Sequence, residues 1–365
     1  MPKIACFVTP HGYGHAARAA AVMSALHELT PDVQFEIFTR VPDWFFAESV
    51  AAPFNYHPVL TDLGLVQRNS LREDIPATLR ALADFLPFDP ALVEQLAGQL
   101  TKSGCGLVLC DISPLGIAVA RAAGLPSVLV ENFTWDWIYE GYASANGQFQ
   151  PHIEYLREMF NAAGTRIQTE PVTHRVPTDL TTGPVSRAVR QPAAQVRAQL
   201  GVAPAEALVV LTMGGAGWSH RNLSQLAQFE GAVFAIAGSG SAAIQREGNL
   251  ITLPHAAGIF HPDLINAANA VIGKVGYSTL AEVYQAGVPF GFVARPRFRE
   301  SGPLVAFVRA NMSGLEIGEA EMASGEWLTA VPRLLALPRA ERPASGGAAQ
   351  IARFILNRWG RAADF

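Results

Sequence analysis

The stretch ANAVIGKVGYSTLAEVYQAGVPFGFVARPRFRE, Ala268 to Glu300, decides the fold of this 365-residue chain. A short apolar strand enters the turn GKVGYST, a helix begins near Ser278 or Thr279, and AGVP ends that helix before a second apolar strand. The free N–H groups and the positive dipole end of such a helix suit a diphosphate. The spacing Thr279-x-x-Glu282 also fits a capping box, so Glu282 either caps the helix or accepts hydrogen bonds from ribose hydroxyls.

The rest of the chain repeats this alternation of apolar strands and helices. The first half contains the strand-like runs KIACFVT, VQFEIF, GLVLC and PSVLVE. After a stretch rich in Pro and Thr at residues 171–192, the alternation restarts with ALVVLTM, AVFAIA, NLITL, NAVI and PFGFV. Strands that are apolar throughout and separated by helices indicate parallel sheets covered on both faces. We therefore predict an α/β protein with two doubly wound, Rossmann-like domains, at residues 1–180 and 187–345, and a terminal helix within residues 346–365.

Composition argues against several classes of partner. The formal net charge of −4 disfavours binding to nucleic acid through phosphate neutralisation. The cysteines Cys6, Cys105 and Cys110 form no CxxC pair, and we interpret them as buried side chains in a reducing compartment. No signal peptide and no run of 18 apolar residues is evident. We expect a soluble cytoplasmic protein without a metal site or a transmembrane segment, and we leave peripheral membrane contact open.

The opening turn, TPHGYGHAARA from Thr9 to Ala19, is the first candidate site. Gly12 and Gly14 permit positive φ, and His15 would begin the following helix. Asp111 follows the buried strand GLVLC directly, so it shares an edge of the sheet with His15 if the two strands are neighbours. A carboxylate that accepts from one imidazole nitrogen fixes the tautomer and stabilises the imidazolium. The alternatives are a plain glycine turn at the first position and a helix cap at the second.

A glycine-rich turn after ALVVLTM is the second candidate site. Gly214, Gly215, Ala216 and Gly217 expose backbone N–H groups that can surround phosphate oxygens. The spacing GxxxxGK[ST] is missing, which argues against a P-loop nucleotidase, and GxGxxG is missing from the opening turn as well.

Taken together and in their order along the chain, the turns and the helix start described above resemble those of glycosyltransferases of the GT-B architecture. GYSTLAEVYQAGVP is similar to the nucleotide-sugar signature of UDP-glycosyltransferases and to the matching region of the peptidoglycan N-acetylglucosaminyltransferase, and PHGYGHAARAAAV resembles their N-terminal turn. A likeness to the glycosyltransferase-like N-terminal half of plant arabinokinases extends further, through HGYGHAAR, DLGLVQRNSLRED, CDISPLGIAVARAAGLPSVLVENFTWDWIY and IGKVGYSTLAEV. The resemblance implies two domains that face each other across a cleft and a C-terminal helix that crosses back to the first domain.

The resemblance also implies roles for individual residues. His15 matches the general base, and Asp111 matches the aspartate that pairs with it. The positions assigned to the donor are Gly14, Gly214, Gly215, Gly217, His255, Lys274, Gly276, Tyr277, Ser278, Thr279, Glu282, Arg299 and Glu300. The positions assigned to the acceptor are His11, Trp135 and Asp136, although the tryptophan could equally fill the junction between domains. The histidine and tryptophan of the plant-type signature are replaced by GKVGY, which leaves sugar and base open and offers Lys274 as a phosphate cation.

The resulting expectation is an inverting, metal-independent glycosyltransferase of the hexosyltransferase type. It would move a sugar from a nucleoside-diphosphate sugar, UDP-linked by resemblance, to an acceptor hydroxyl that His15 deprotonates. No cofactor is expected beyond this co-substrate. The alternative is a non-catalytic nucleotide-sugar-binding or scaffold protein of the same fold, because the arabinokinase half is attached to a different catalytic domain. An epimerase ranks lower, since the acidic residues that it needs around the anomeric carbon are not evident.

Overall fold

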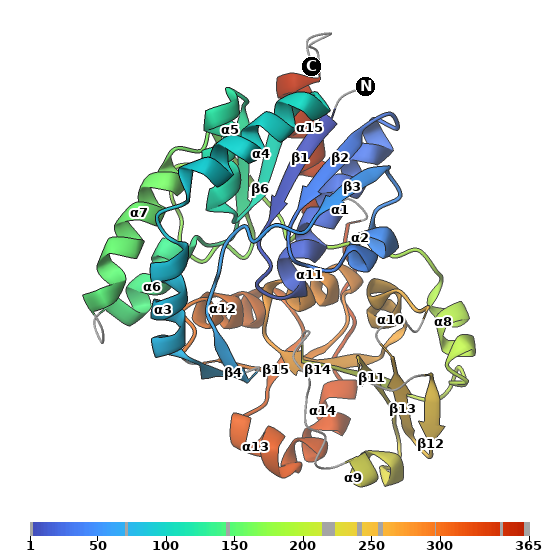
Figure 1. Cartoon of the computed structure of the whole chain (residues 1–365). Helices are drawn as coiled ribbons and strands as arrows, with labels where there is room; N and C mark the ends of the chain where they lie inside the picture. The colour runs from blue at the N-terminus through green and yellow to red at the C-terminus, as the bar shows by residue number, and fades with distance from the viewer. Residues whose placement is uncertain are drawn as a thin grey trace. The chain divides into compact units, whose positions relative to one another are not determined.

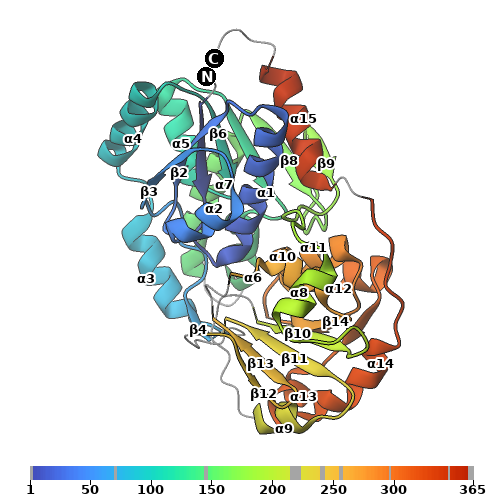
Figure 2. The ribbon, with the colours of Figure 1, turned by 90° about the vertical axis from the view of Figure 1, so that its right-hand side faces the viewer.

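The structure is a computed structural model that describes residues 3–69, 72–143, 147–213, 223–238, 243–254, 258–295, 297–343 and 346–360. The chain forms two compact units, both drawn in Figures 1 and 2. Unit 1 comprises Met1–Arg187, Phe298–Glu300 and Ser345–Phe365, and unit 2 comprises Ala188–Arg297 and Ser301–Ala344. The C-terminal helix is therefore part of the first unit, as the GT-B resemblance implies.

Unit 1 is built on a parallel sheet in the order β3-β2-β1-β6-β7-β8-β9. Its strands are β1 (Lys3–Val8), β2 (Gln34–Phe38), β3 (Phe54–His57), β6 (Cys105–Asp111), β7 (Ser127–Glu131), β8 (Thr165–Thr169) and β9 (Leu180–Thr182). A separate antiparallel pair consists of β4 (Gln67–Asn69) and β5 (Arg72–Glu73).

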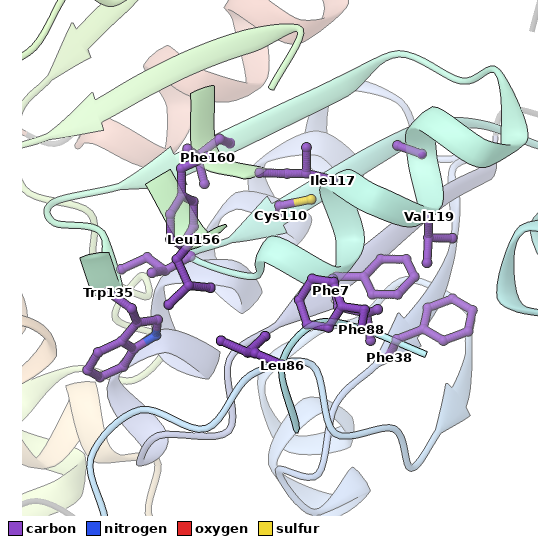
Figure 3. Packing of buried hydrophobic residues seen from close by; sticks show 14 of the residues in the cluster. Phe7, Phe38, Leu86, Phe88, Cys110, Ile117, Val119, Trp135, Leu156 and Phe160 are labelled. Carbon is purple, nitrogen blue, oxygen red and sulfur yellow. The ribbon is translucent and has the colours of Figure 1, made fainter. Parts of the chain in front are cut away.

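Helices cover both faces of this sheet because its strands are apolar on both sides. Along β1, Ile4, Cys6 and Val8 face one core cluster, while Ala5 and Phe7 face the other. The helices of the first face are α1 (Tyr13–Leu29), α2 (Asp43–Ser49) and α15 (Gly347–Trp359). Those of the second face are α3 (Ile75–Phe85), α4 (Pro90–Ser103), α5 (Pro114–Ala123), α6 (Trp135–Ala143), η1 (Gly147–Phe149) and α7 (Gln150–Asn161). Figure 3 shows the packing of this second cluster, in which the rings of Phe7 and Phe38 stack at 4.5 Å.

Unit 2 repeats the plan with the order β12-β13-β11-β10-β14-β15-β16, parallel except for the pair β12–β13. The strands are β10 (Leu208–Thr212), β11 (Val233–Ala237), β12 (Gln245–Glu247), β13 (Leu250–Leu253), β14 (Ala270–Lys274), β15 (Phe290–Val293) and β16 (Gly314–Glu316). One face carries α8 (Ala193–Gln199), α10 (His261–Ala267), α11 (Tyr277–Ala286) and α12 (Ser301–Asn311). The other carries α9 (Leu223–Gln228), α13 (Glu319–Ser324), η2 (Glu326–Ala330) and α14 (Val331–Leu335).

Each sheet has a point at which the strand order reverses direction, and ligands of open α/β sheets bind at the carboxyl ends of the strands there. In unit 1 this point lies between β1 and β6. In unit 2 it lies between β10 and β14. The turns that follow these four strands are the same turns that the sequence singles out.

The structure adds a strand to the Pro- and Thr-rich stretch at residues 171–192 and corrects two helix starts. The added strand is β9, which pairs with β8. The helix α1 begins at Tyr13, before His15, and α11 begins at Tyr277, before Ser278. A glycine, Gly12 or Gly276, occupies the N-cap position of each helix.

The glycine of AGVP has a measurable structural role. Gly287 and Gly104 both end a helix with positive φ, at 68° and 71°. A Cβ at Gly287 would lie 1.8 Å from the carbonyl oxygen of Ala340, whereas a Cβ at Gly104 would meet nothing within 4 Å. We expect Gly104→Ala to lower the free energy of unfolding by about 1 kcal/mol, the cost of the backbone conformation. Gly287→Ala should cost a further 1–3 kcal/mol, roughly the range for overpacking. Denaturant unfolding of the two variants tests this, and equal losses would contradict it.

Candidate active site

The strand-end turns of unit 1 bring His15 and Asp111 together. In the parallel pair β1–β6, Val8 lies beside Asp111. The chain turns at Gly12, whose φ is 79°, and α1 then places His15 in its first turn. Gly14 is helical, so only Gly12 of the two glycines needs positive φ. The strand β1, which precedes His15, and the strand β6, which ends at Asp111, are thus neighbours in the sheet.

Asp111 does not cap the next helix. Ser113 is the N-cap of α5, and its hydroxyl oxygen accepts a hydrogen bond from the backbone N–H of Gly116 at 3.3 Å. Between them, Ile112 adopts φ of 48°, an uncommon conformation for a β-branched residue. Such backbone strain tends to occur at functional sites, where the surrounding structure fixes it. The carboxylate of Asp111 is left for other partners.

The imidazole of His15 is one of those partners. Its Nδ1 lies 3.1 Å from Oδ1 of Asp111, and the two side chains are 10% and 2% exposed. A carboxylate only accepts hydrogen bonds when ionised, so Nδ1 is the protonated nitrogen of this pair. The lone pair of the neutral ring then lies on Nε2. The ring of His15 also meets that of Phe133 edge-on at 5.8 Å.

Arg18 is the residue that sequence reasoning missed. Its guanidinium donates from Nε to Oδ2 of Asp111 at 2.7 Å and from Nη2 to Oδ1 at 2.8 Å. Its Nη1 donates to Oδ1 of Asn132 at 2.7 Å. The signal was available as spacing, because residues three apart on a helix share a face and Arg18 follows His15 by three.

The charge of Arg18 controls the ionisation of Asp111. Burial would raise the pKa of the Asp111 carboxyl, but the charge of Arg18 and hydrogen bonds from Arg18 and His15 outweigh burial and hold that pKa below its usual value. Asp111 is therefore a carboxylate at neutral pH. It can stabilise a positive charge on the imidazole.

A second buried aspartate, Asp62, is hydrogen-bonded to the opening turn. Oδ1 of Asp62 accepts a hydrogen bond from the hydroxyl of Thr9 at 2.5 Å, and Oδ2 accepts one from Nε1 of Trp135 at 3.1 Å. Burial raises the pKa of the Asp62 carboxyl to about 8, against the hydrogen bonds from Thr9 and Trp135 that lower it. Trp135 is itself buried, and its ring lies 4.9 Å from that of His11 and 6.5 Å from that of His15. The ring of Trp135 therefore lies near the rings of both histidines.

The remaining acceptor residue and two donor residues lie around α6. Asp136 is buried in the first turn of α6, with Oδ2 3.6 Å from Nε of Arg157. Arg299 belongs to unit 1, where its guanidinium lies over the ring of Trp137 at 4.2 Å. Glu300 also belongs to unit 1, and its Oε1 accepts from Nδ2 of Asn132 at 2.8 Å. Asn132 thereby connects Glu300 to the group formed by His15, Asp111 and Arg18.

In unit 2, the turn between β14 and α11 and the first turn of that helix contain five of the expected donor residues, Gly276 among them. Lys274 ends β14, and Tyr277, Ser278 and Thr279 form the first turn of α11. The N-cap of this helix is Gly276, which has no side chain to accept from the first backbone N–H groups.

Of the two roles considered for Glu282, the structure excludes the capping box. With α11 starting at Tyr277, Glu282 stands beyond the third helical position that a capping box requires. The Glu282 side chain is buried and its Oε2 lies 2.6 Å from Nδ1 of His261, at the start of α10. His261 was not anticipated, since it is distant in sequence and precedes a proline in an unremarkable apolar segment.

Four expected donor residues, Gly214, Gly215, Gly217 and His255, lie outside the described residues. Within the described ranges, no three His, Cys, Asp or Glu side chains are grouped as metal ligands would be. In the same ranges, no helix is long and apolar enough to cross a membrane.

Comparisons with known proteins agree with the architecture. A scan against protein families finds none that matches the chain. The L-arabinokinase of Arabidopsis thaliana is 31% identical over 361 residues, which are 96% of this chain. The chain spans only 34% of the length of that relative.

Solved structures of several glycosyltransferases are similar over almost the whole chain. The calicheamicin glycosyltransferase CalG4 has a TM-score of 0.64 at 15% identity, with 99% of each chain covered. A UDP-glucosyltransferase from Polygonum tinctorium has a TM-score of 0.62 at 14% identity, with 98% of each chain covered. MurG of Acinetobacter baumannii has a TM-score of 0.53 at 15% identity, with 97% of this chain and 95% of that one covered. These similarities confirm the GT-B fold and the resemblance stated from the sequence.

Proposed function

We propose that this protein is an inverting glycosyltransferase that transfers a sugar from a UDP-sugar to an acceptor hydroxyl, without a metal ion. The observation that carries the proposal is the buried pair of His15 and Asp111 at the strand-order reversal of unit 1, with Nδ1 and Oδ1 3.1 Å apart. A donor-binding protein needs no such pair. The similarity to glycosyltransferases at the level of fold supports the reaction class.

His15 acts as the general base in this proposal. Nε2 removes the proton of the acceptor hydroxyl while the oxygen attacks the anomeric carbon and the bond to the diphosphate breaks. The imidazolium formed is stabilised by the carboxylate of Asp111, which remains ionised. A single displacement inverts the configuration at the anomeric carbon.

Residues of unit 2 bind the donor. The backbone N–H groups at the start of α11 and the positive end of its dipole bind the diphosphate. Lys274, at the end of β14, adds a positive charge at the same turn. The leaving diphosphate is then stabilised by fixed protein groups. Glu282, oriented by His261, accepts hydrogen bonds from the ribose hydroxyls.

Glu282→Gln should weaken donor binding by about 10-fold, because hydrogen bonds to a charged group contribute roughly 1.5–3 kcal/mol and the amide retains an acceptor. Isothermal titration with UDP measures the Kd. Glu326→Gln, on the exposed side of η2, is the matched control and should bind as the wild type does. An unchanged Kd for Glu282→Gln would remove Glu282 from the donor site.

A panel of nucleotides and nucleotide sugars in a thermal-shift assay tests the donor class, because a ligand that binds only the native state raises the apparent Tm. The ligand with the largest shift is then supplied with an acceptor panel, and release of the nucleotide is measured. Binding of UDP-sugars together with transfer supports the proposal. Binding without hydrolysis or transfer favours the alternative, a nucleotide-sugar-binding protein, for which the limited coverage of the arabinokinase is the motivating observation. The absence of any shift with uridine nucleotides contradicts the UDP-sugar donor, and the absence of a shift with every nucleotide tested contradicts both interpretations.

A further inference from the structure

Arg18 connects several parts of unit 1 to the proposed base. It lies one helical turn after His15, and its side chain is 0% exposed. In addition to both oxygens of Asp111 and to Asn132, its Nη1 reaches the hydroxyl of Thr169 at 3.4 Å. One guanidinium thus joins α1 to the carboxyl ends of β6, β7 and β8.

We propose that Arg18 is a positioning residue of the transfer reaction: it holds the Asp111 carboxylate in the orientation that accepts from Nδ1 of His15 and so presents Nε2 to the acceptor. This inference rests on the proposed function. It assigns to Arg18 no contact with either substrate.

The geometry explains why an arginine is suited to this task. The two parallel hydrogen bonds from Nε and Nη2 fix the plane of the carboxylate, which a single bond would leave free to rotate. The far nitrogen, Nη1, is held in turn by Asn132, so the guanidinium itself cannot turn. A lysine has the same charge but no planar fork, and it cannot form this pair of bonds.

Two groups compete for Nδ1 of His15. Nη2 of Arg18 lies 3.4 Å away and could only donate to an unprotonated Nδ1, whereas Oδ1 of Asp111 lies 3.1 Å away and accepts from a protonated one. The contact with Asp111 is shorter and involves a charged acceptor, and Nη2 already donates to Oδ1 at 2.8 Å. The arrangement therefore selects the tautomer in which Nε2 is the base.

The charge of Arg18 also determines when the pair takes up a proton. With a neutral imidazole, the positive charge of Arg18 and the negative charge of Asp111 cancel. Without the guanidinium one buried negative charge remains, so the pair of His15 and Asp111 binds a proton at higher pH.

Other titratable groups lie around this pair. His11 and Asp62 both contact Trp135. Glu131 interacts electrostatically with Arg18, and Glu300 is hydrogen-bonded to Asn132. They stay the same in every variant compared below.

The test compares kcat/KM as a function of pH in the wild type, Arg18→Met, Arg18→Lys and the control Arg121→Met, whose side chain is exposed on α5. Arg18→Met should lose about 10²-fold in kcat/KM, the scale expected for misplaced catalytic groups, and the acidic limb of its profile should move to higher pH. Arg18→Lys should lose roughly 10-fold with the limb unmoved, because it keeps the charge and loses the fork. A merely structural role would lower the active fraction without moving the limb. An unmoved limb in Arg18→Met, or wild-type kcat/KM in Arg18→Lys, would overturn the proposal.

A second measurement needs no turnover. The ¹⁵N chemical shifts of the His15 ring report which nitrogen carries the proton. We expect protonated Nδ1 and unprotonated Nε2 in the wild type and a mixture of tautomers in Arg18→Lys, which also serves if Arg18→Met does not fold. The wild-type tautomer persisting in Arg18→Lys would refute the positioning role. The selected tautomer in a protein that transfers no sugar would refute the proposed function and leave to Arg18 only the orientation of Asp111 and His15.

Discussion

Replacing His15 with alanine is expected to lower kcat for sugar transfer by about 10²–10⁴-fold, the usual loss when a general base is removed. The imidazole is held by Asp111 at 3.1 Å through Nδ1, so Nε2 is the atom that accepts the proton of the acceptor. Alanine removes this acceptor and leaves the carboxylate of Asp111 paired with Arg18. The fold should therefore persist. Initial rates with saturating donor and acceptor measure the effect.

Donor binding provides the internal check on this result. The residues that we assign to the donor diphosphate and ribose lie in unit 2, so the Kd for UDP should be the same in His15→Ala and in the wild type. His152→Ala, on the partly exposed surface of α7, is the matched control and should retain wild-type kcat. If His15→Ala retained wild-type kcat as well, the assignment of the base would fail while the donor site could still stand.

Much of the fold could be predicted from the sequence because its central strands are fully buried. Runs such as GLVLC and ALVVLTM have no polar face, which is typical of strands covered by helices on both sides. Among the strands that went unnoticed, β3 (FNYH), β8 (TRIQT) and β9 (LTT) lie toward the edges of the sheet of unit 1 and contain polar side chains. They are held in the sheet by backbone pairing with a neighbour, and pairing of that kind leaves no periodic signal in one sequence.

The candidate site followed from the sequence only where a residue ends a strand or starts a helix. His15 and Asp111 meet this condition, and adjacency of β1 and β6 brings them together. Arg18 lies inside an alanine-rich helix, where a single charged residue is normally solvated, so its burial depends on partners far away in the sequence. His261 is hidden for the same reason, because its partner Glu282 is on another helix.

Asp111→Asn should be among the most destabilising conservative substitutions in unit 1. The amide has the shape of the carboxylate but no charge, and it leaves the guanidinium of Arg18 buried without its counterion. Breaking a buried ion pair by neutralising one partner costs about 3–5 kcal/mol. Equilibrium denaturation at neutral pH should show this loss. Asp84→Asn, at an exposed position of α3, should leave the free energy of unfolding unchanged.

The dependence on pH separates this electrostatic loss from a loss of packing. The pKa of Asp111 is lower in the folded protein than its ordinary value of 3.8. Between the two values the unfolded chain binds more protons than the folded one, so the contribution of Asp111 to stability rises with pH and is complete above 3.8. It is lost as the pH falls through the folded value. The difference in unfolding free energy between the wild type and Asp111→Asn should therefore be greatest at neutral pH and shrink as the pH falls through this range. A difference that stayed constant over the same range would mean that the carboxylate acts by shape, and it would remove the charge from the role that we assign to Asp111 beside His15.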